Sequence, residues 1–205
     1  MVIARHGDTF EPGEPPRRIG SRTDLPLTAN GRRQACQLGH ALTAAGFAFG
    51  AALTGPLDRA RLTAQLLLSV MPGAPQPSVI PLLNEVDHGP DEDQPEAAVL
   101  ARSGADALAA WDDEASPPLG WIVDRDARLE WWRTLFDAPP PGDTLIVTSN
   151  GSARFALLAM NALRRPTSLK LRTGAFGVLR RDLGHTWTVD VWNMRPGEAG
   201  EPTCL

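Results

Sequence analysis

The alternation of short apolar, β-branched runs with stretches of helical spacing constrains this fold most strongly. Thr144–Thr148 has the composition of a buried strand, and the apolar stretch Gly151–Leu163 that follows it is typical of a helix. Val2–Ala4 and Ala51–Leu53 are further strand candidates, and helical patterns follow both along the chain. Strands that alternate with helices predict an α/β fold, with a mostly parallel sheet and helices on both faces.

The remaining predicted elements fit within one domain, since 205 residues suffice for a single well-formed α/β core. They are a helix between Thr28 and Gly46, a helix from about Leu57 to Val70, a third strand at Val79–Leu83, and a largely helical segment at 97–138 broken around 116–118. Two last strands are predicted at Ala175–Arg180 and Thr186–Trp192.

Composition excludes several classes of function. Twenty basic and 24 acidic residues give a net charge of −4, which argues against a nucleic-acid binder or a protein of anionic membranes. The apolar runs are too short to span a bilayer, and the first residues lack a signal-peptide pattern, so we expect a cytoplasmic protein. Lys170 is the only lysine and does not follow a glycine-rich loop, which excludes a Walker-type phosphate loop. Two cysteines, Cys36 and Cys204, make neither a disulfide framework nor a four-ligand zinc site.

Reactive side chains follow three of the predicted strands. Arg5 and His6 come after the first strand, Arg59 comes just after the second, and Asn150 comes after Thr144–Thr148. Ligands of such sheets bind beyond the carboxyl ends of the strands. A guanidinium beside an imidazole disfavours protonation of the ring and pairs with phosphate oxygens, as phosphoryl transfer to histidine requires. An Arg-His-Gly tripeptide alone occurs by chance in many proteins, and an isolated His6 would be an ordinary loop histidine.

Five segments in order carry a more specific signal. They are Ala4–Thr9, Asp24–Gly31 followed by Gln34-Ala35, Thr54–Ala64, Leu83–Glu85 with Gly89, and Val147–Gly151. Their sequence and order resemble the histidine phosphatase superfamily, the phosphoglycerate-mutase-like proteins, over roughly residues 1–90 and 142–192. The resemblance implies a three-layer α/β/α sandwich, a phosphohistidine intermediate, and no metal or other cofactor. It also implies that the segment at about 97–138, where family members vary, is a helical insert that caps the strand ends.

The resemblance also implies roles for individual residues. His6 would be the nucleophile, Arg5 and Arg59 would clamp the phosphoryl group, and Glu85 would protonate the leaving alcohol. The alternative for Arg59 is a stem that covers the helix surface, and the alternative for Glu85 is one charge of a solvated acidic loop. The ordered match favours the catalytic roles for both.

Asn150 departs from the family pattern, which has a second histidine at this position. An asparagine amide donates a hydrogen bond but always stays neutral. Asn150 and Gly151 would still bind phosphate beside the free N–H groups of the following helix. We therefore consider three hypotheses: a metal-independent phosphatase acting on a small phosphorylated substrate, an impaired member that binds a phosphorylated ligand or partner, and a phosphomutase. The oligomeric state stays open.

Several other residues have two interpretations. Arg18 and Arg22, with Arg17, would bind a second anionic group of the substrate or would be solvated loop charges. The tryptophans of the 97–138 segment would wall a substrate pocket or, more commonly, pack in a core. His88 is a minor rival acid or base, but a histidine in an acidic loop more often faces solvent.

Overall fold

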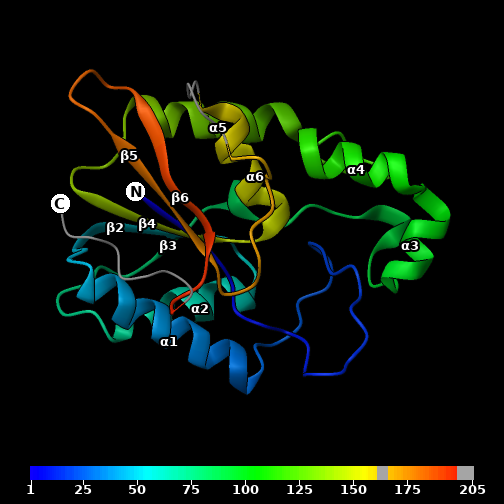
Figure 1. The fold of residues 1–205 in the computed structure, drawn as a ribbon, viewed down its shortest axis with the longest axis horizontal. Coiled ribbons are helices and arrows are strands. Elements are labelled where there is room, and N and C mark those ends of the chain that lie inside the picture. Colours follow the sequence, from blue (N-terminus) through cyan, green and yellow to red (C-terminus); the bar gives the residue numbers. More distant parts are fainter. Residues whose placement is uncertain (161–165, 198–205) are drawn as a thin grey trace.

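A central sheet of six strands organises the part of the chain that the computed structural model describes, residues 1–160 and 166–197. The strands lie in the order β3-β2-β4-β1-β5-β6 (Figure 1). Their bounds are β1 Val2–Arg5, β2 Phe49–Thr54, β3 Ser78–Val79, β4 Asp143–Thr148, β5 Phe176–Arg181 and β6 Trp187–Met194. The first four strands pair in parallel, whereas β5 and β6 are antiparallel additions at one edge.

The pairing of β1 with β4 determines where the predicted site residues meet. Arg5 lies opposite Thr148 in the register of this parallel pair. The backbone N–H of His6 continues the ladder and donates to the carbonyl oxygen of Thr148 at 3.0 Å. The two strands therefore end level, and the residues that follow them leave the sheet at the same edge.

Helices cover both faces of the sheet, which confirms the predicted three-layer α/β/α sandwich. The helices are α1 Ala29–Ala44, α2 Asp58–Ser69, α3 Glu96–Ser103, α4 Ala105–Glu114, α5 Arg125–Asp137 and α6 Asn150–Ala159. Figure 1 shows α1 and α2 on one side of the sheet and α5 and α6 on the other. Alternate strand residues supply the two cores: Leu145 and Val147 pack in the core toward α1 and α2, and Ile146 packs in the core toward α5 and α6.

The start of α1 is held against the loop that follows β1. The hydroxyl oxygen of Thr28 accepts from the backbone N–H of Gly31 at 3.0 Å, which caps the helix as predicted. Gly7 and Gly31 touch backbone to backbone, because a Cβ at Gly7 would lie 2.3 Å from the carbonyl oxygen of Gly31. This close approach fixes the direction in which the chain leaves His6.

The 97–138 segment folds into α3, α4 and α5, with a non-helical break at 115–124. Trp111, Trp121 and Trp132 are buried in the same core as Ile3 and Ile146 of the sheet. In Figure 1, α3 and α4 extend beyond the sheet, beside the segment that follows β1. An isolated bridge between Arg17 and Pro95 joins these two parts.

Two predicted elements differ from the structure. The third strand contains only Ser78–Val79, because Pro81 begins a short 3₁₀ helix, Pro81–Leu83, where the strand was expected to continue. Helix α6 begins at Asn150 rather than Gly151 and is described to Ala159. The rest of its predicted length, through Leu163, lies outside the described residues. No described helix is long and apolar enough to cross a membrane.

Candidate active site

His6 lies at the centre of the candidate site, directly after β1, and is only 1% exposed. Its Nδ1 lies 2.9 Å from the carbonyl oxygen of Gly7, which can only accept, so Nδ1 carries the ring proton. The unprotonated Nε2 then accepts from Nε of Arg59 at 3.2 Å. Burial, followed by the charges of Arg59 and Arg5, holds the pKa of His6 well below its usual value. The imidazole is therefore neutral, and its unprotonated Nε2 is the atom that could act as a nucleophile once a phosphoryl group displaces the hydrogen bond from Arg59.

Arg59, in the first turn of α2, is held by the segment that precedes α1 and is 1% exposed. Its Nη1 donates to the carbonyl oxygen of Thr23 at 2.6 Å, and its Nη2 donates to that of Gly20 at 3.0 Å. Asp24 accepts from the backbone N–H of Asp58 at 2.6 Å and lies 3.3 Å from Nη1 of Arg59. One carboxylate thus caps α2 and orients the guanidinium beside His6.

Arg5 and Asn150 are held by the same residue, Leu171. Nη1 of Arg5 donates to the Leu171 carbonyl oxygen at 3.0 Å, and the Leu171 N–H donates to Oδ1 of Asn150 at 2.8 Å. Burial lowers the pKa of Arg5 to about 10, so its guanidinium keeps its charge at neutral pH. Nε of Arg5 is buried and has no hydrogen-bond partner among the described residues. Because Oδ1 of Asn150 is the acceptor, its Nδ2 is left as a hydrogen-bond donor.

Glu85 faces the N-terminus of α6 and is 6% exposed. Its Oε2 accepts from the backbone N–H of Gly151 at 3.1 Å, and its Oε1 accepts from that of Val86 at 2.9 Å. Burial by itself raises the pKa of Glu85, but His88, these two N–H groups and Arg59 together bring it below the usual value. A Cβ at Gly151 would lie 2.0 Å from Oε1, so only glycine allows this approach. The carboxylate thus binds where a helix N-terminus accepts anions.

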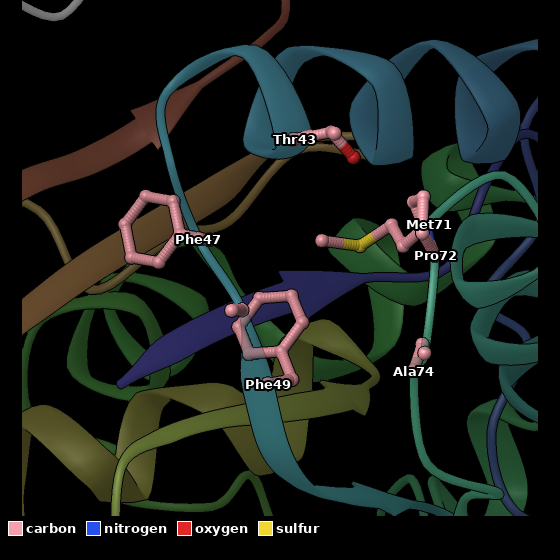
Figure 2. Close-up of a pocket in the computed structure, with 8 residues that line it drawn as sticks. Thr43, Phe47, Phe49, Met71, Pro72 and Ala74 are labelled. Atoms are coloured by element: carbon pink, nitrogen blue, oxygen red, sulfur yellow. The ribbon is translucent and has the colours of Figure 1, made fainter.

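The cavity in Figure 2 lies away from these residues. It encloses about 60 Å³ between the end of α1, the start of β2 and the segment after α2. Thr43, Phe49 and Met71 line it. It is small and carries no charged side chain, so it does not suit a phosphorylated ligand. Within the described residues, no group of three or more histidine, cysteine, aspartate or glutamate side chains could hold a metal ion.

The family of this chain is decided by comparison with known proteins. The family model of the histidine phosphatase superfamily, branch 1, matches residues 1–195. The chain belongs to the histidine phosphatase superfamily. This confirms the resemblance found in the sequence.

The proteins that this chain resembles include mutases and phosphatases. It is 30% identical to the 2,3-bisphosphoglycerate-dependent phosphoglycerate mutase 2 of Gloeobacter violaceus over 77% of this chain and 73% of that protein. It is 32% identical to the corresponding mutase of a Bradyrhizobium species, of which it spans only 48%. The crystal structure of the alpha-ribazole phosphatase of Shigella flexneri superposes with a TM-score of 0.70 and 26% identity, covering 95% of this chain and 96% of that one. A mycobacterial glucosyl-3-phosphoglycerate phosphatase, at 22% identity, TM-score 0.74 and coverages of 94% and 97%, shows the shared fold.

The other predicted site residues are paired with carboxylates or buried. Arg18 pairs with Glu96 at 2.5 Å, and Arg22 pairs with Asp87 at 3.0 Å, so each guanidinium is already matched by a carboxylate. The expectation that His88 faces solvent is wrong, since it is 4% exposed. The neighbouring carboxylates Glu92 and Asp91 accept hydrogen bonds from Gly20 and Arg102, which lie outside the acidic loop. These contacts help to bury a loop that its acidic composition predicts to be solvated.

Three residues that support the site or the helix beside it were not assigned such a role from the sequence. Leu171 acts through its peptide groups, which no side-chain pattern reveals. Asp24 belongs to a matched segment, but its capping of α2 depends on tertiary folding. Arg154 lies one turn after Asn150 on α6 and is fully buried, with its guanidinium carbon 4.2 Å from the centre of the Trp111 ring. It donates to the Trp111 carbonyl oxygen and so ties α6 to α4.

Proposed function

We propose that this protein is a metal-independent phosphatase that hydrolyses a small phosphomonoester through a phosphohistidine on His6. The observation that carries the proposal is the state of His6: a buried, neutral imidazole whose unprotonated Nε2 faces Arg59. Arg5, Asn150 and the N-terminus of α6 meet at the same edge of the sheet. A nucleophile surrounded by donors and cations suits attack on a phosphoryl group, whose charge spreads over its oxygens in the transition state.

The proposed reaction has two steps. Nε2 of His6 attacks phosphorus, the bond from phosphorus to the ester oxygen breaks, and the leaving alkoxide takes a proton from the Glu85 carboxyl. Water then attacks the phosphohistidine and gives its proton to Glu85, while the bond from phosphorus to nitrogen breaks and returns neutral His6. Arg5, Arg59, Nδ2 of Asn150 and the Gly151 N–H donate to the phosphoryl oxygens in both steps.

Glu85 must gain a proton before it acts as the acid, because its pKa lies below the usual value when it accepts from Gly151. A phosphoryl dianion would compete for the same N–H group and place negative charge beside the carboxylate. Both effects raise the pKa of Glu85. We infer that substrate binding converts Glu85 from a carboxylate that binds the helix N-terminus into an acid.

We also propose that the 97–138 segment covers the leaving group. The ring of Trp121 lies edge-on to that of His88, with 4.4 Å between centres, and His88 is three residues from Glu85. The guanidinium of Arg18 lies 5.4 Å from the centre of the Trp121 ring. Arg22 binds Asp87 and the Gly89 carbonyl oxygen on either side of His88. Arg18 and Arg22 are therefore candidates to meet a second anionic group, after exchange of their carboxylate partners.

The proposal is tested by incubating the purified protein with a set of phosphomonoesters and measuring free phosphate. The set contains sugar phosphates, nucleotide-derived phosphates, phosphoserine and an aryl phosphate. We expect release from at least one alkyl ester and from the aryl ester, in the presence of a chelator. Absence of release from every ester, with no phosphate attached to the protein, would reject the catalytic proposal.

Two alternatives rest on specific observations. The neutral side chain of Asn150 supports an impaired protein that binds a phosphorylated ligand without turnover, which would bind tungstate yet release no phosphate. The names of the curated relatives support a phosphomutase. A mutase would move the phosphoryl group between hydroxyls of one substrate faster than it releases phosphate. The same incubation separates these cases when the products are identified.

Replacing Glu85 with glutamine should selectively slow the reaction of esters with poor leaving groups. The burst of alcohol released from alkyl phosphates should slow by ~10²–10⁴, because their alkoxides need the proton, whereas the burst from an activated aryl phosphate should slow by less than about tenfold. The second step, in which Glu85 takes the proton of water, should slow equally for both. The amide oxygen can still accept from the Gly151 N–H, but the amide nitrogen then faces the Val86 N–H, so thermal unfolding of the variant is measured beside its activity. The matched control is Glu130→Gln, the same change at an exposed position of α5. Equal slowing of alcohol release from both ester types would show that Glu85 is not the acid.

A further inference from the structure

The backbone that leads into Glu85 is held by side chains from other elements. A short 3₁₀ helix ends two residues before Glu85, and the last carbonyl oxygens of a helix have no partner within it. The carbonyl oxygen of Leu83 accepts from Oγ1 of Thr148 in β4 at 2.6 Å. That of Leu82 accepts from Oγ of Ser152 in α6 at 3.3 Å. These two contacts fasten the 3₁₀ helix to the end of the sheet and to the start of α6.

Arg128, in the first turn of α5, holds the residue directly before Glu85. Its Nη1 donates to the carbonyl oxygen of Asn84 at 2.7 Å and to that of Leu82 at 3.1 Å. The side chain is 8% exposed, so water cannot readily replace it as the donor. One guanidinium nitrogen therefore joins the end of the 3₁₀ helix to the loop that carries the carboxylate.

The same part of the chain also holds the residues after Glu85. The N–H of Ile122 donates to the carbonyl oxygen of Asp87 at 2.9 Å, and the N–H of Asp87 donates to the carbonyl oxygen of Ile122 at 3.3 Å. This antiparallel bridge lies two residues beyond Glu85, whereas the contact with Arg128 lies one residue before it. Residues 122–128 of the insert thus hold the loop on both sides of the carboxylate.

The position of Glu85 leaves little tolerance for movement of this loop. Its Oε2 lies 3.1 Å from the N–H of Gly151, and a Cβ at Gly151 would lie 2.0 Å from its Oε1. The carboxyl group reaches the N-terminus of α6 only while the backbone at Asn84 keeps its place. A displacement of about 1 Å between reacting groups can lower a rate by about 10²-fold.

We propose that Arg128 is a positioning residue for the acid: it holds the carbonyl oxygens of Asn84 and Leu82, so that the Glu85 carboxyl lies where the leaving alcohol needs its proton. This inference rests on the proposed function. It gives the 97–138 insert a part in the chemistry besides covering the leaving group. Arg128 touches neither the substrate nor the reacting atoms and acts only through Glu85.

Packing of α5 on α6 is the structural alternative, since the guanidinium carbon of Arg128 lies 5.8 Å from the centre of the Phe155 ring. Arg128→Met keeps an apolar stem against Phe155 but loses every hydrogen-bond donor. Arg128→Lys keeps a donor and the charge. The matched control is Arg133→Met, the same change at an exposed position of α5. Thermal unfolding of each variant shows whether the fold is retained.

The leaving group separates positioning from packing. In Arg128→Met, the burst of alcohol from an alkyl phosphate should slow by ~10–10², and the burst from an activated aryl phosphate by less than about threefold. Arg128→Lys should recover most of the loss. The double variant with Glu85→Gln should be no slower than Glu85→Gln alone, because Arg128 acts through that carboxyl. Equal slowing of both esters, or losses that add in the double variant, would overturn the inference.

A second measurement does not require turnover. The amide proton of Gly151 reports the position of Glu85, because a charge-assisted hydrogen bond to a carboxylate moves its resonance downfield. In ¹H–¹⁵N spectra we expect this resonance to move upfield in Glu85→Gln and in Arg128→Met, and to stay close to its wild-type position in Arg128→Lys. An unchanged resonance in Arg128→Met would overturn the inference and leave the proposed phosphatase intact. An upfield shift in a protein that releases no phosphate would reject the phosphatase and keep the role of Arg128 in holding Glu85.

Discussion

Replacing His6 with asparagine should abolish the phosphoenzyme and lower phosphate release by at least about 10³-fold, since nothing else at the site supplies an equivalent nucleophile. Asparagine approximates the position of Nδ1, so its Nδ2 can keep the hydrogen bond to the Gly7 carbonyl oxygen, while the Nε–H of Arg59 stays free to meet the phosphoryl group. The change thereby removes the nucleophile while preserving the charge that binds phosphate. Tungstate should still bind to the variant.

The adduct is measured by mixing the protein with ³²P-labelled ester and quenching at alkaline pH, because phosphohistidine is labile to acid. We expect label on the wild type and none on His6→Asn. His185→Asn, the same substitution at an exposed histidine, should be labelled like the wild type. Label that persists in His6→Asn would place the covalent phosphate on another residue and refute the proposed mechanism. Thermal unfolding of both variants shows whether the fold is retained.

The parts of the site that lie at strand ends could be predicted from the sequence. The β-branched run at Thr144–Thr148 and the short run at Val2–Ala4 form neighbouring parallel strands, and parallel strands bring their following residues to one edge. His6 and Asn150 are therefore brought to that edge by local patterns alone. The start of α1 could be predicted for a similar reason, because the Thr28 cap is a local hydrogen bond.

The features of the site that depend on its backbone geometry or on contacts between distant segments could not be predicted. The orientation of Asn150 follows from the N–H of Leu171, 21 residues away, which has no sequence signature. The proton position on His6 follows from the backbone carbonyl of the adjacent Gly7, whose direction is likewise not visible in the sequence. The burial of His88 depends on Gly20 and Arg102, which bind the carboxylates of an acidic loop from elsewhere in the chain. The sequence pattern of that loop indicates charge but not which backbone groups will neutralise it.

The hydrogen bond between Leu171 and Asn150 predicts the effect of substitutions at position 150. The Leu171 N–H needs an acceptor, and Oδ1 of Asn150 provides one at 2.8 Å. Asn150→Asp keeps this acceptor and suits the N-terminus of α6, where a negative charge is favourable, so the fold should be retained. It removes the Nδ2 donor and sets a carboxylate against the phosphoryl group. We expect kcat/KM to fall by ~10²–10³ and tungstate binding to weaken. Unchanged kcat/KM in this variant would show that Asn150 does not face the phosphoryl group.

Asn150→His tests whether the neutral side chain limits activity. A histidine that accepts from the Leu171 N–H must leave that ring nitrogen unprotonated, and the nearby charge of Arg5 also opposes an imidazolium. The new side chain should therefore stay neutral and donate through its other nitrogen, much as the amide does. We expect kcat/KM on simple esters to remain within about tenfold of the wild type. A larger gain would show that the ring escapes Leu171 and acts as a cation, and that Asn150 weakens an otherwise complete site. A larger loss, confined to the best substrate in the set, would show instead that the amide of Asn150 recognises that substrate.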